Sequence, residues 1–176
     1  GSTLLANLSS NLTAVENNPG KRYQSLQQAS YSTWSDGPFG TQGSDPGKSI
    51  SYYNKGPVVG LLLDFQIRQA TGNKASLDDV MRLLYWKYYK EENRGFTEAE
   101  FQAACEKIAG IPLAGFFEYV YTTREIDYDR YLAYGGLKLE KKAADATGKG
   151  APKFVIARIE NPTALQSSIL RSWMGE

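Results

Sequence analysis

Tyr53 is the residue whose type and position best suit it to chemistry. It lies in Tyr52-Tyr53-Asn54-Lys55-Gly56, directly ahead of an apolar segment from Pro57 to Arg68 that has the composition of a buried helix. A phenol has a pKa of about 10, so it stays protonated at neutral pH and can donate a hydrogen bond to an oxyanion that forms in a transition state. The sequence therefore predicts a hydrogen-bond donor at the mouth of a buried helix.

Other residue types used in catalysis are scarce. The chain has no histidine and one cysteine, Cys105. Cys105 lies at the spacing of an apolar helix face within Phe101–Ile108 and has no histidine to act as its base, so we expect a buried, unreactive thiol. A single cysteine excludes an internal disulfide framework and any metal site built from several cysteines. Whatever chemistry Tyr53 assists, the other catalytic groups must lie elsewhere.

Composition narrows the classes of partner. The 176 residues are 41% hydrophobic and 22% charged, with a net charge of +1 and interleaved acidic and basic residues. These values are typical of a globular protein and leave no basic surface for nucleic acid. The longest apolar run, Pro57–Leu63, is far shorter than the roughly 20 residues that cross a bilayer. We therefore expect no nucleic-acid partner and no membrane span; the composition fits a cytoplasmic and an exported protein equally well.

Helical periodicity dominates the chain up to residue 136. The apolar spacing predicts helices over 4–17, 22–34 and 57–70, and two shorter helices around Phe116 and Tyr128. Ser76 is predicted to cap another helix, and Thr97 with Glu100 predict a capping box at the start of the next one, with Phe96 and Phe101 as its hydrophobic staple. The inward stripe expected after Ser76 comprises Leu77, Val80, Met81, Leu84, Tyr85 and Tyr88. Residues 35–49, rich in Gly, Pro, Ser and Asp, predict an irregular loop.

The pattern changes after Gly135-Gly136. Residues 137–140 and 154–160 alternate as strands do, and the Ala-, Gly- and Lys-rich residues 141–152 between them predict a flexible linker. Asn161 as N-cap with Pro162 in the first helical position predicts a last helix. The expected fold is mainly α: a helical subdomain over 3–136, followed over 137–176 by a two-stranded, hairpin-like appendage with its linker and a C-terminal helix.

Several stretches of the chain, taken in order, resemble one family. They are Ser51-Tyr52-Tyr53-Asn54-Lys55-Gly56, Leu61-Leu62-Leu63-Asp64-Phe65-Gln66-Ile67-Arg68, Ser76-Leu77-Asp78-Asp79-Val80-Met81-Arg82, Gly95-Phe96-Thr97-Glu98-Ala99-Glu100-Phe101, and Tyr119-Val120-Tyr121-Thr122-Thr123 ahead of Ile126-Asp127-Tyr128. Together they resemble the C-terminal half of the catalytic region in the glycyl aminopeptidase family of zinc metallopeptidases. Members of that family are thermolysin-like and often carry a PDZ domain.

This resemblance implies a fold like the C-terminal helical subdomain of thermolysin-like metallopeptidases. It also implies a zinc aminopeptidase that hydrolyses peptide substrates, with Tyr53 stabilising the tetrahedral oxyanion. The family's zinc ligands, two histidines and a glutamate, would lie N-terminal to this chain, so we expect zinc in the parent enzyme, none bound by this fragment, and no activity without the N-terminal part of the same catalytic domain. No metal ligand and no substrate-binding residue can be assigned here. Residues 141–152 are too few to contain a PDZ domain, which is either deleted or naturally absent.

A non-catalytic alternative remains open. Exposed aromatic residues at Tyr85, Trp86, Tyr88 and Tyr89 would suit a helical protein-interaction or scaffold domain.

The sequence also suggests roles for the neighbours of Tyr53 and for the long loop that follows residue 35. We expect Tyr52 to pack, and Lys55 to be solvated or paired with a carboxylate. Arg22 and the loop from Asp36 to Ser49 are candidates for lining a substrate cleft, although a plain surface role is equally consistent with their composition.

Overall fold

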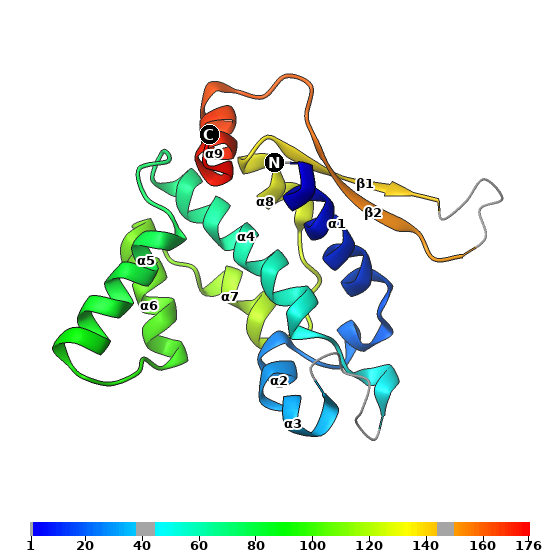
Figure 1. Cartoon of the computed structure of the whole chain (residues 1–176), viewed down its shortest axis with the longest axis horizontal. Coiled ribbons are helices and arrows are strands. Elements are labelled where there is room, and N and C mark those ends of the chain that lie inside the picture. Colours follow the sequence, from blue (N-terminus) through cyan, green and yellow to red (C-terminus); the bar gives the residue numbers. More distant parts are fainter. Residues whose placement is uncertain (1, 38–44, 144–149) are drawn as a thin grey trace.

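The computed structural model describes residues 2–37, 45–143 and 150–176. It is mainly helical, with a pair of antiparallel strands and a C-terminal helix, as expected from the sequence (Figure 1). The elements are α1 (Ser2–Asn17), η1 (Pro19–Arg22), α2 (Leu26–Tyr31), α3 (Thr33–Asp36), η2 (Pro46–Lys48), α4 (Tyr52–Ala70), α5 (Leu77–Leu84), the π-helix η3 (Tyr85–Glu91), α6 (Glu98–Ala109), α7 (Ala114–Tyr121), α8 (Tyr128–Tyr134), β1 (Leu137–Lys142), β2 (Lys153–Arg158) and α9 (Ala164–Met174).

Helix α4 is the centre of the core. Its side chains from Val58 to Ile67 are buried except for the half-buried Gly60, because α1 and α8 pack on one side and α5, α6 and α7 lie on the other (Figure 1). At its C-terminal end, Trp173 of α9 meets the ring of Phe65 edge to face at 5.6 Å. Burial of each large apolar side chain contributes about 1.5–3 kcal/mol. The buried residues of α4 from Val58 to Ile67 therefore contribute much of the stability of the core.

Helix α4 begins at Tyr52, so the prediction that it starts at Pro57 is wrong. Pro57 lies inside the helix. Proline fixes φ near the helical value and removes one backbone donor, so it can continue a helix that burial stabilises, at the cost of a hydrogen bond. The consequence for function is that Tyr52 and Tyr53 occupy the first turn of a rigid helix and not a preceding loop.

The two capping predictions are confirmed, and the stripe prediction is confirmed in part. Ser76 forms a capping box with Asp79, and Thr97 forms one with Glu100. Along α5 and η3, Val80, Leu84 and Tyr88 are buried, Leu77 is half-buried, and Met81 and Tyr85 are exposed. The prediction is wrong for these last two because they lie on a flank that no described element covers.

The strands pair from Leu137↔Arg158 to Lys142↔Lys153 and lie against α1. The Thr13 hydroxyl accepts a hydrogen bond from the Phe154 N–H at 2.9 Å and donates one to the Phe154 carbonyl at 3.0 Å. The Ser9 hydroxyl accepts from the Ile156 N–H at 2.9 Å. Hydroxyl groups of α1 thus satisfy backbone groups of β2 that would otherwise need a third strand.

Two other helix boundaries differ from the prediction. The helix expected over 22–34 is divided at Ser32 into α2 and α3, and α2 starts with a capping box of Ser25 and Gln28. The last helix is capped by Thr163, not Asn161, because Thr163 and Gln166 satisfy two backbone donors reciprocally.

Parts of two predicted segments cannot be compared with the structure. Residues 38–44 of the predicted loop and 144–149 of the predicted linker lie outside the described residues. In the described part of the chain, no helix combines the length and apolar character needed to cross a membrane.

Candidate active-site surface around Tyr53

Tyr53 lies in the first turn of α4 with 56% of its surface exposed. The next residues of the helix turn inward almost at once, since Lys55, Val58 and Val59 are buried. The backbone of Tyr53 belongs to a buried helix while its phenol is exposed to solvent. A side chain in this arrangement is held in place and can contact a substrate.

The hydroxyl group of Tyr53 is hydrogen-bonded to that of Tyr52, and their ring centroids lie 4.5 Å apart. Thr33 on α3 in turn donates to the Tyr52 hydroxyl oxygen at 3.4 Å. The hydrogen bond with Tyr52 raises the pKa of Tyr53, whereas hydrogen bonds from Thr33 and Tyr53 lower the pKa of Tyr52. Tyr53 therefore keeps its proton at neutral pH, and Tyr52 forms hydrogen bonds in addition to the packing that we expected.

Lys55 is the buried residue of the first turn of α4. Its side chain is only 3% exposed, so the expectation that it is solvated is wrong. Burial lowers the pKa of Lys55, and the charge of Glu16 on α1 opposes that shift. None of the ion pairs in the described part of the chain includes Lys55. A cavity of about 30 Å³ beside it has room for a water molecule.

The polar cluster behind α4 is centred on Glu16. Its carboxylate accepts a hydrogen bond from the Tyr128 hydroxyl at 2.8 Å and forms an ion pair with Lys21. These contacts join α1, η1 and α8 on the side of α4 that faces away from α5, α6 and α7 (Figure 1).

An apolar groove starts at Tyr52 and follows α4 toward α6 and α7. Its volume is about 530 Å³, and its lining includes Tyr52, Gly56, Gly60, Phe101 and Tyr121. The groove was not among the features predicted from the sequence. The spacing of Gly56 and Gly60, one helical turn apart in an otherwise apolar helix, was the available signal that this face of α4 is open.

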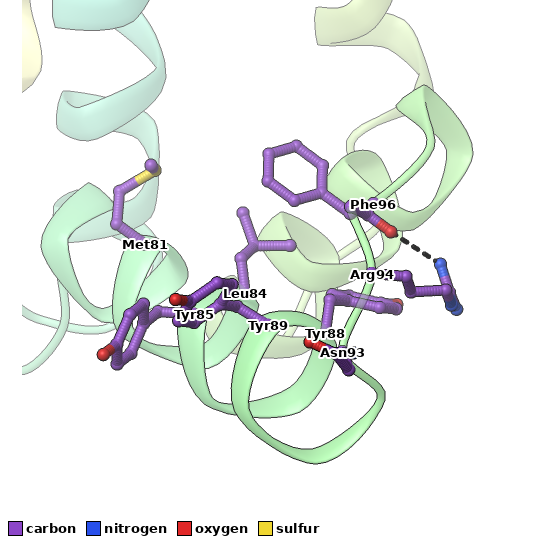
Figure 2. Close-up of a pocket in the computed structure, with 9 residues that line it drawn as sticks. Met81, Leu84, Tyr85, Tyr88, Tyr89, Asn93, Arg94 and Phe96 are labelled. Carbon is purple, nitrogen blue, oxygen red and sulfur yellow. Dashed lines mark hydrogen bonds between the residues drawn. The ribbon is translucent and has the colours of Figure 1, made fainter.

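A second cavity of about 500 Å³ lies between α5, η3 and the loop ahead of α6 (Figure 2). Tyr85 and Tyr89 stack with ring centroids 5.3 Å apart, and the Lys90 ammonium lies over both rings. Of the four aromatic residues in the interaction alternative, Tyr85, Trp86 and Tyr89 are exposed. Tyr88 is buried under Arg94.

The other candidate residues do not meet in the groove. Arg22 is exposed and lines the small cavity beside Lys55. Of the loop from Asp36 to Ser49, Asp36 accepts a hydrogen bond from Gln24 at 3.0 Å, and Lys48 pairs with Asp45. Across residues 2–37, 45–143 and 150–176, no group of three or more His, Cys, Asp or Glu side chains is placed to hold a metal ion. The described residues therefore do not fit a zinc ion.

The fold is similar to part of a solved aminopeptidase structure. A crystal structure of an aminopeptidase N family protein from Idiomarina loihiensis matches with a TM-score of 0.69 and 26% sequence identity. The match covers 79% of this chain but only 24% of that one, so the chain spans about a quarter of its length. No curated protein matches the chain.

The family model of the M61 glycyl aminopeptidases matches residues 1–59. The resemblance to the glycyl aminopeptidase family is thereby confirmed for the first third of the chain. The matched region runs from the start of α1 to the first two turns of α4 and includes Tyr53.

Proposed function

We propose that this chain is part of a zinc-dependent aminopeptidase and forms the tyrosine side of its active-site cleft. The observation that carries the proposal is the position of Tyr53, an exposed phenol in the first turn of the buried helix α4, inside the region that matches the peptidase family. The substrates would be peptides that present a free N-terminus.

Tyr53 would act as a hydrogen-bond donor to the oxyanion that forms when the scissile carbonyl is attacked. Its raised pKa keeps the proton on the phenol. In the free protein this proton is donated to the Tyr52 hydroxyl oxygen, so the O–H bond would have to turn from Tyr52 to the oxyanion. A hydrogen bond to a developing negative charge is stronger than one to a neutral hydroxyl group. The exchange of Tyr52 for the oxyanion as acceptor would therefore favour the transition state over the ground state.

Zinc is the second part of the proposal. Because the described residues offer no site for it, the ion and its ligands would come from polypeptide outside this chain, in the N-terminal part of the same catalytic domain. In the complete enzyme, zinc supplies Lewis-acid polarisation of the carbonyl and lowers the pKa of a bound water molecule. The isolated chain would then have no peptidase activity.

The proposal is tested on a longer protein that contains this chain and the polypeptide ahead of it. We expect peptide hydrolysis that a chelator abolishes and added zinc restores, and no hydrolysis by the 176-residue chain alone. Activity that survives complete removal of metal would contradict the zinc part. Loss of activity in Tyr53→Phe, measured beside Tyr89→Phe as an exposed control, separates the role of the phenol from a general effect of losing a hydroxyl group.

A second function is favoured by the exposed aromatic residues beside η3. Tyr85 and Tyr89 line a cavity, and Trp86 packs edge to face against Tyr85. All three lie on a π-helix, an element that often marks functional sites. If the protein is a non-catalytic interaction domain, Trp86→Ala abolishes binding of its partner while Tyr53→Phe has no effect on any activity.

A further inference from the structure

We propose that the small cavity beside Lys55 binds one monovalent inorganic anion of the size of chloride. The cavity lies between α1, η1, the first turn of α4 and the segment ahead of α8. The Lys55 ammonium and the Arg22 guanidinium would bind the anion. This inference is independent of the proposed function, because the peptidase proposal uses neither residue.

Lys55 is a buried cation without a partner in the protein. Its side chain is 3% exposed. In the part of the chain that the structure describes, it forms no ion pair and no side-chain hydrogen bond. Lysine is almost never buried to this extent unless it is paired, because an uncompensated charge away from water is costly. The ammonium therefore needs a partner that the neighbouring side chains do not supply.

The Lys55 ammonium reaches the cavity. Among the described residues, every fully enclosed side-chain nitrogen or oxygen has a hydrogen-bond partner. The Lys55 ammonium has none, so it is not fully enclosed, and Lys55 is one of the residues that line the cavity. The volume of about 30 Å³ is close to that of one molecule in liquid water. A monatomic ion fits such a space, whereas sulfate, phosphate and organic carboxylates are too large.

Six charged side chains line the cavity, four of them basic and two acidic. Two of the basic ones are already neutralised, since Lys21 pairs with Glu16 on α1 and Arg124 pairs with Glu118 on α7. The three lining residues that belong to no ion pair within the described residues are Arg22, Lys55 and Glu125.

The charge of these three residues favours an anion over water. Two cations and one carboxylate leave one positive charge, which a single monovalent anion cancels. A water molecule would accept a hydrogen bond from Lys55 but would leave that charge uncompensated. Hydrogen bonds between a cationic donor and an anion are also stronger than those to a neutral acceptor. Burial lowers the pKa of Lys55, and a bound anion would oppose that shift as the charge of Glu16 already does.

The cavity lies behind the helical turn that carries Tyr53. Residues two positions apart on an α-helix are about 200° apart around its axis, so Lys55 and Tyr53 point to different sides of α4. Lys55 lines the cavity, and Tyr53 is exposed to solvent. The anion would therefore stabilise the first turn of α4 without contacting a substrate, and its effect should be visible in the stability of the chain.

The test compares the 176-residue chain in sodium chloride and in sodium gluconate of equal ionic strength, because gluconate is too large for the cavity. We expect a saturable broadening of the chloride NMR signal, which gives the dissociation constant. At about ten times that constant, chloride should raise the melting temperature by about 3–6 °C. Lys55→Met keeps the length of the side chain and removes its charge, so it should abolish both effects.

Two further variants separate the site from general surface charge. Arg22→Gln should weaken chloride binding by at least about tenfold, because it removes a charged donor. Arg22 is exposed, so this change leaves the core intact. Lys107→Met is the matched control: Lys107 is exposed on α6, and its replacement removes the same charge far from the residues that line the cavity. Chloride binding should then be as in the wild type.

Equal melting temperatures in the two salts would overturn the proposal, as would saturable broadening that persists in Lys55→Met. An equal loss in Lys107→Met would also overturn it, because chloride would then be an adventitious ion only. If Lys55→Met does not fold, Arg22→Gln decides: unchanged chloride affinity in that variant rejects the site, and a tenfold loss supports it.

Discussion

The Tyr128 hydroxyl donates a hydrogen bond of 2.8 Å to the Glu16 carboxylate, 112 residues away in the chain, and so joins α8 to α1. This contact closes the polar cluster behind the first turn of α4. The charge of Glu16 also acts on Lys55, which is buried in the same helical turn as Tyr53.

Tyr128→Phe should destabilise the protein, because the Glu16 carboxylate loses a buried donor. Hydrogen bonds to charged groups contribute about 1.5–3 kcal/mol, so the free energy of unfolding should fall by about that amount in urea titrations. Tyr31→Phe is the control, since Tyr31 is exposed on α2 and its change should be small. Equal effects of the two variants would show that the contact with Glu16 has no special weight.

The Arg94–Glu100 ion pair should make stability depend on pH in the acid range. The hydrogen bond from Arg94, together with the Thr97 N–H, lowers the pKa of Glu100 from 4.5 to about 2. A carboxyl group with a lowered pKa in the folded state stabilises that state above the unfolded pKa, and this contribution is lost as pH falls from 4.5 toward 2. Glu100→Gln keeps the capping box but removes the charge, so wild type and variant should converge in stability as pH falls through this window.

Cys105 should be unreactive in the folded protein. Burial, and next the charge of Glu106, raise the pKa of Cys105 to about 12, so almost no thiolate is present at neutral pH. A thiol reagent such as DTNB should react with it only after denaturant is added. Rapid reaction of the native protein would show that α6 opens readily from the core.

Features that depend on a few neighbouring residues could be predicted from the sequence. The caps at Ser76 and Thr97 follow from a side chain and its partner three residues later, and the burial of Cys105 follows from helical spacing. The place of Tyr53 at the mouth of a buried helix follows from the apolar run behind it. In each case the decisive contact is local.

Features that need several elements to converge could not be predicted. Lys55 is buried only because α1 and the segment ahead of α8 close over it, and no pattern around position 55 shows that. Met81 and Tyr85 have the spacing of an inward stripe, but nothing in the described chain covers their flank. The groove forms where α2, α4, α5, α6 and α7 meet. Gly56 and Gly60 were therefore its only signs in the sequence.

The most direct test of the central claim is kcat and KM for Tyr53→Phe in the longer zinc-containing protein. If the phenol stabilises an oxyanion, kcat should fall by about 10² to 10³, as it does when one such donor is removed. KM should change by less than roughly threefold, because the contact is made only in the transition state. A folded Tyr53→Phe enzyme whose kcat stays within roughly twofold of wild type would contradict the account.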